Sequence, residues 1–92
     1  MHTILFYDVV DDYVEAARQV SPAAFGTRKQ SQQRGELVLA GALAEPADGA
    51  ILVFRGESPD IATAFAKSDP YVTNGLVKAW RVRKWNTVIG SE

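Results

Sequence analysis

The sequence predicts an α+β fold of the ferredoxin-like type, with the element order β-α-β-β-α-β and a four-stranded antiparallel sheet. Four runs rich in β-branched and aromatic residues are typical of strands, and the segments between them carry helix signals. The chain has 92 residues, which is enough for one domain and no more. We therefore expect a single domain over residues 1–92.

The first β-α-β unit begins with residues 2–7, a β-branched and aromatic run that predicts a strand. A helix is expected to start at Asp11 or Asp12, since aspartate is a residue type that caps helices. Pro22 then starts a second helical stretch over residues 22–34, because proline fits the first position of a helix. Gly35 ends this stretch, as glycine often does.

The second unit is marked more clearly. Residues 37–43 and 50–55 predict the second and third strands. Ser58 precedes a proline and is expected to cap a helix, which must stop near Asp69 because another proline follows. Residues 77–85 predict the fourth strand.

The predicted strands are apolar on both faces. Ile51 and Leu52 are neighbours in the third strand and therefore point to opposite faces. Leu37 and Leu39 of the second strand are expected to share one face, with Gly41 suggesting a bulge. Because two helices cover only one face of such a sheet, we expect a homodimer partner to cover the other. The alternative is that some of these residues are simply tolerated at the surface.

Composition excludes several functions. Lys and Arg number 10 against 11 Asp and Glu, so no basic surface for nucleic acid is expected. The chain has no cysteine, and its one histidine, His2, is expected near a frayed terminus; we expect no metal and no cofactor. No apolar run approaches the length of a membrane span and no signal peptide is visible, so we expect a cytoplasmic protein without a membrane partner.

Asp69, Pro70 and Tyr71 form the most specific local feature. Pro70 forces Asp69 toward an extended backbone, where its carboxylate could face a cleft and act as a general acid or base. The alternative is a helix stop in which Asp69 accepts hydrogen bonds from nearby backbone N–H groups.

Tyrosines and arginines supply the candidate ligand contacts. Tyr7, Tyr13 and Tyr71 could orient a ligand through their hydroxyls, or be core aromatics with their tips at water. Arg81 in the fourth strand could bind an anion or line a dimer seam, or belong to a charged, solvated edge strand. The candidate ligand-binding residues are Tyr7, Tyr71 and Arg81.

The chain resembles the YCII-related (YciI-like) family of the dimeric α/β-barrel superfamily. Two segments carry the resemblance: QQRGELVLAGAL at residues 32–43 and SDPYVTNGLV at residues 68–77, which contains an Asp-Pro-Tyr match. The resemblance implies a ferredoxin-like fold and a homodimer formed through the sheets. It also implies a histidine–aspartate pair in a pocket, with Asp69 as the aspartate.

This sequence departs from the family pattern where the resemblance places the histidine. That position is Ala24, and the arginine that precedes it in the family is Ser21. A methyl group cannot accept a proton, so we favour a small-molecule-binding domain that is catalytically silent or of altered chemistry. The alternative is a cofactor-free lyase or isomerase using Asp69 as general acid or base on a small aromatic or acidic substrate. A heme-using monooxygenase is disfavoured, because its only histidine ligand would be His2.

Overall fold

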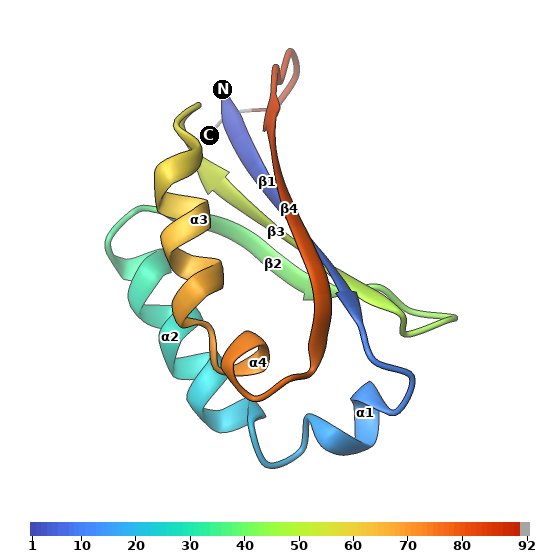
Figure 1. Cartoon of the computed structure of the whole chain (residues 1–92). Helices are drawn as coiled ribbons and strands as arrows, with labels where there is room; N and C mark the ends of the chain where they lie inside the picture. Colours follow the sequence, from blue (N-terminus) through green and yellow to red (C-terminus); the bar gives the residue numbers. More distant parts are fainter. Residues whose placement is uncertain (91–92) are drawn as a thin grey trace.

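A computed structural model of the chain describes residues 1–90 and shows an α+β, ferredoxin-like fold. Four antiparallel strands form one sheet in the order β2-β3-β1-β4 (Figure 1). The strands are β1 (His2–Val9), β2 (Leu37–Ala42), β3 (Gly49–Arg55) and β4 (Val77–Trp85). The helices are α1 (Tyr13–Ala16), α2 (Ser21–Gln33), α3 (Pro59–Ser68) and α4 (Pro70–Thr73).

In the second half of the chain, the helix α3 begins and ends where the sequence predicts. Ser58 caps α3 by accepting a hydrogen bond from the Asp60 N–H, and Pro59 occupies the first turn. Asp69 then leaves the helical conformation, with ψ at 127°, because Pro70 follows it. The short helix α4, which the sequence did not predict, starts directly at Pro70.

The first half differs from expectation in its helices. The helix at Asp12 is one turn long, and α2 runs without a break through Gly26 to Gln33. The prediction for His2 was wrong. The terminus is not frayed at His2, because its side chain is buried and its Nδ1 lies 2.9 Å from the Thr87 hydroxyl. Pairing with β3 and β4 on either side holds this end of the chain in place.

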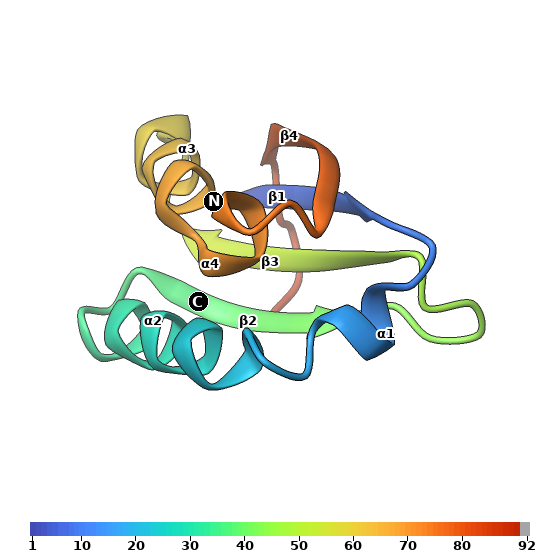
Figure 2. The same cartoon turned by 60° about the horizontal axis from the view of Figure 1, so that its bottom comes forward.

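The helices α2, α3 and α4 lie on the same side of the sheet (Figures 1 and 2). The core between these layers holds Leu5 and Tyr7 of β1, and Leu52 and Phe54 of β3. Against them pack Ala62, Phe65 and Ala66 of α3. The small alanines let α3 approach the sheet closely, so residues at its C-terminal end are buried against β1. No helix in residues 1–90 is long and apolar enough to cross a membrane.

The opposite face of the sheet, here called the open face, carries Ile4, Phe6, Leu39, Ile51 and Val53. Leu39 is 67% exposed, and Ile4, Phe6 and Ile51 are half-buried. The prediction that Leu37 and Leu39 share a face was wrong. The register of β2 against β3 shifts between these two residues, so Leu37 packs into the core and Leu39 joins the open face. The irregularity lies before Gly41, not at it.

Position 49, at the start of β3, requires glycine because two backbones approach each other closely there. It pairs with Asp8, and a Cβ atom at this position would lie 2.7 Å from the Tyr7 carbonyl oxygen. Only glycine fits without a shift of the central strand.

Candidate functional site

Asp69 is the buried polar centre of the molecule. It sits between α3 and α4, and its side chain is completely inaccessible to solvent. Its Oδ1 accepts a hydrogen bond of 3.2 Å from the Tyr71 N–H, which caps α4. The helix-stop interpretation is therefore correct for one oxygen, but three further bonds come from distant residues.

Arg28 of α2 makes two of these bonds. Its Nη1 donates to Oδ1 of Asp69 and its Nη2 to Oδ2, each at 3.0 Å. Nη1 also donates to the Ala24 carbonyl oxygen, one turn earlier, at 3.2 Å. Two planar N–H groups on two carboxylate oxygens form the bidentate arrangement that arginine favours.

The Arg28 guanidinium is also enclosed by two aromatic rings. It lies 5.3 Å from the ring centroid of Phe65 and 4.9 Å from that of Tyr71. Ring faces attract cations, and here they shield the ion pair from water. The side chain of Arg28 is 17% exposed.

Tyr7 of β1 makes the fourth bond. Its hydroxyl donates to Oδ2 of Asp69 at 2.6 Å. Burial, together with this bond to Asp69, raises the pKa of Tyr7 above its ordinary value. The phenol therefore stays protonated at neutral pH and acts as a donor.

The number of donors on Asp69 decides whether its carboxylate can accept a proton from a bound molecule. A carboxylate offers about four lone-pair directions. Arg28 occupies two, Tyr7 one and the Tyr71 N–H one. Asp69 can take a proton from a bound molecule only after one of these donors has moved.

Tyr71 and Tyr13 extend the cluster toward the surface. The hydroxyl of Tyr71 lies 2.9 Å from Oγ of Ser21, and its ring meets that of Tyr13 edge-on at 5.6 Å between centroids. Burial and the neighbouring Tyr71 raise the pKa of Tyr13 to about 12. Both phenols are partly exposed.

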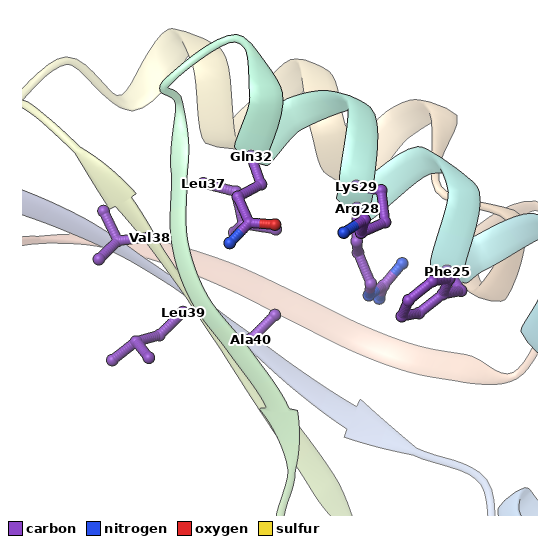
Figure 3. Close-up of a pocket in the computed structure, with 8 residues that line it drawn as sticks. All are labelled: Phe25, Arg28, Lys29, Gln32, Leu37, Val38, Leu39 and Ala40. Carbon is purple, nitrogen blue, oxygen red and sulfur yellow. The ribbon is translucent and has the colours of Figure 1, made fainter.

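Two adjoining cavities lie along β2, and Arg28 and Ala40 line both. One, of about 200 Å³, lies between α2 and β2 beside Phe25, Gln32 and Leu37 (Figure 3). The other, of about 190 Å³, lies beside Tyr13, Tyr71 and the small residues of β2. We call them together the α2–β2 groove. A cavity of roughly 150 Å³ already admits a benzene ring, so each has room for a small aromatic molecule.

The structure brings together Asp69, Tyr7 and Tyr71, three of the four residues predicted from the sequence. Arg81 lies elsewhere. It pairs with Phe6 in the sheet and its guanidinium stacks 4.4 Å from the Phe6 ring, on the open face. Among residues 1–90, no group of three histidine, cysteine, aspartate or glutamate side chains could hold a metal ion.

Arg28 is the residue that the sequence reasoning missed. It sits in the wholly polar run of residues 28–34, where no apolar residue marks the face of the helix that packs inward. A signal was present: Ala24 and Ser31, four residues before and three after, are small and fully buried. These spacings place Arg28 on the inner face of α2, where a charged residue needs a partner.

A model of the YCII-related domain family matches residues 1–86. No curated protein matches in sequence. The structure is similar to 5-chloro-2-hydroxyhydroquinone dehydrochlorinase (TftG) from Burkholderia phenoliruptrix, solved in complex with 2,5-dihydroxybenzoquinone; the TM-score is 0.77 at 17% identity, over 94% of each chain.

Two further structures are similar at lower scores. A protein from Nitrosomonas europaea of the antibiotic biosynthesis monooxygenase type has a TM-score of 0.62 at 15% identity, over 97% of this chain and 100% of that one. The structured domain of BMY-1 from Caenorhabditis elegans has a TM-score of 0.57 at 16% identity, over 96% and 99%. At these identities the likenesses concern the fold alone.

Proposed function

Since this chain belongs to the YCII-related domain family, we propose that it is a single small-molecule-binding domain whose aspartate no longer performs proton transfer. The α2–β2 groove would receive a small aromatic or acidic molecule. Asp69 would hold Arg28 and the tyrosines in place around it. No cofactor is needed for this role.

The four donors on Asp69 are the observation that supports this proposal most strongly. A general base needs a free lone pair directed at the substrate. In Asp69 each direction meets a protein donor, and the side chain does not reach the solvent. The arrangement is suited to fixing neighbouring side chains.

The residue at position 24 supports the same proposal. The family resemblance places a histidine there, and this chain has Ala24, which is fully buried on α2. Arg28 extends from the next turn, hydrogen-bonds the Ala24 carbonyl oxygen and reaches Asp69. We infer that arginine has taken over the pairing with the aspartate, and that an always-charged group has replaced one that exchanges protons near neutral pH.

The experiment has two arms. The first is a thermal-shift and calorimetric screen of small aromatic acids and phenols, in which we expect saturable binding. The second is chloride release from 5-chloro-2-hydroxyhydroquinone, the compound in the name of TftG, in which we expect no release above the protein-free rate. Absence of any binding would contradict the ligand-binding proposal, and turnover would contradict catalytic silence.

A second candidate is a cofactor-free lyase or isomerase with Asp69 as general acid or base. The observation in its favour is the burial of Asp69 beside Tyr7, Tyr71 and Arg28, an environment in which carboxylates serve acid–base roles. Arg28 would have to swing away when substrate binds. Chloride release that Asp69→Asn abolishes, in a variant that still folds, would favour this candidate.

We also propose that the chain forms a homodimer through the open face and works in the cytoplasm. Leu39, Ile51 and Phe6 form an apolar surface without a covering layer in the single chain. Arg81 would then lie at the dimer seam, where its guanidinium covers Phe6. A second copy of the same face would remove this surface from water.

A further inference from the structure

The α2–β2 groove carries an uncompensated positive charge. Two cationic residues, Arg28 and Lys29, line its larger cavity, and no acidic residue lines either cavity. The charge of Arg28 is matched by Asp69. Lys29, by contrast, forms no ion pair within the part of the chain that the structure describes. A ligand with a negative charge would therefore complement the groove.

Arg28 keeps donors for a ligand after its bonds within the protein are made. A guanidinium has five N–H groups. The structure uses three of them, on the Ala24 carbonyl oxygen and on the two oxygens of Asp69. The two remaining N–H groups are left for a ligand, and Arg28 lines both cavities.

The same cavity offers apolar contacts for the body of a ligand. Phe25 is 65% exposed, an unusual position for a large aromatic side chain, and Leu37 of β2 lies at the other end of the cavity, beside Gln32 (Figure 3). Phe25, Lys29 and Gln32 are three or four residues apart, so α2 presents them on one face. Figure 3 shows Phe25, Arg28 and Lys29 extending from neighbouring turns into the space between α2 and β2.

We propose that the groove selects a small planar carboxylate of the benzoate type. The carboxylate lies at Lys29 and the free edge of Arg28, and the ring lies against Phe25. This inference rests on the proposed ligand-binding function and narrows it from aromatic or acidic molecules to aromatic acids. Lys29 is the residue that distinguishes an anion from a neutral molecule, because the Arg28–Asp69 pair is neutral as a whole.

The test compares two isosteric probes, benzoate and benzamide, by calorimetric or NMR titration of the full chain at low ionic strength. We expect benzoate to bind about fivefold more tightly, the size of effect that a partly exposed charge pair gives. The preference should fall as salt is raised. Lys29→Met should abolish it, whereas Lys67→Met, a change of a lysine on the exposed side of α3, should leave it intact.

Three outcomes would overturn the inference. Equal binding of benzoate and benzamide would refute anion selection while leaving the ligand-binding function standing. A preference that both lysine variants reduce equally would show a general charge effect and no site at Lys29. Binding of neither probe, nor of any compound in the wider screen, would refute both the inference and the proposed function. Both lysines are exposed, so the variants are expected to fold.

Discussion

Arg28 and Asp69 are 41 residues apart in the chain and are joined by two hydrogen bonds of 3.0 Å. Asp69 is fully buried and Arg28 nearly so. Little water can therefore reach either side chain. Each charge is stabilised by the other charge and not by solvent. Tyr7 and the Tyr71 N–H donate to the remaining lone pairs. Every acceptor position of the carboxylate is therefore occupied by a protein donor.

Replacement of Arg28 should strongly destabilise the protein. Arg28→Met leaves the Asp69 carboxylate buried with two of its four donors gone, and we expect a loss of about 3–5 kcal/mol in the free energy of unfolding. Urea unfolding followed by circular dichroism measures it. Arg34→Met is the matched control, because Arg34 pairs with Glu36 at the surface; it should cost at most about 1 kcal/mol. Equal losses would contradict the central role of the buried pair.

Stability should fall in alkaline solution because of the buried phenols. The folded-state pKa values of Tyr7 and Tyr13 lie above the ordinary value of 10.0, and that of Tyr13 reaches about 12. A raised folded-state pKa means that the unfolded chain loses its proton first, so the stabilisation is complete below pH 10 and is lost as pH rises above it. Unfolding titrations from pH 8 to pH 11 should show this decline.

Substitutions of the two tyrosines show which phenol causes the loss of stability at high pH. Tyr13→Phe should reduce the slope of stability against pH above pH 10 with little loss at pH 8. Tyr7→Phe should also reduce the slope, but it should cost about 1.5–3 kcal/mol at pH 8, because a hydrogen bond to a charged group is lost. An unchanged slope in both variants would assign the decline to other groups.

The open face should determine the oligomeric state. Light scattering should give about twice the chain mass of 10.0 kDa. Leu39→Lys should convert the dimer to a monomer, since Leu39 is 67% exposed in the single chain and a charge there would be buried against the partner. Val14→Lys changes a similarly exposed residue on α1 and should leave the dimer intact. A monomer mass for the unmodified chain would refute the homodimer.

Gly49 should not tolerate a side chain. Gly49→Ala places a methyl group against the Tyr7 carbonyl oxygen, and we expect a loss of about 1–3 kcal/mol in unfolding free energy. The control is Gly41→Ala in the neighbouring strand, where a Cβ atom meets nothing within 4 Å. If both alanines have the same effect, strand propensity outweighs the contact at Gly49.

The fold could be predicted from the sequence because its signals are local. Ser58, Pro59 and Pro70 fix the ends of α3 through their own backbone preferences. The alternation in β3 likewise follows from strand geometry. The shift in register between Leu37 and Leu39 was not predictable, because it depends on how β2 pairs with β3.

The site was predicted only in part, because some of its residues carry local signals and others do not. Asp69, Tyr7 and Tyr71 stood out by residue type and by the Asp-Pro-Tyr segment. Which residue pairs with Asp69 depends on the packing of α2, and no pattern near Asp69 encodes it. Arg81 was assigned to the site because arginine is suited to binding an anion, yet it pairs with Phe6 on the open face, and Trp80 is the residue opposite Tyr7.

The place of Asp69 in the chain has a consequence for how the molecule opens. Its side chain binds β1 through Tyr7, α2 through Arg28 and α4 through the Tyr71 N–H. Segments from both β-α-β halves are thus tied to one residue, and detaching any of them uncovers a charge. We expect the two halves to exchange their core amide hydrogens in one concerted event, with no partly open form in which α2 leaves the sheet alone.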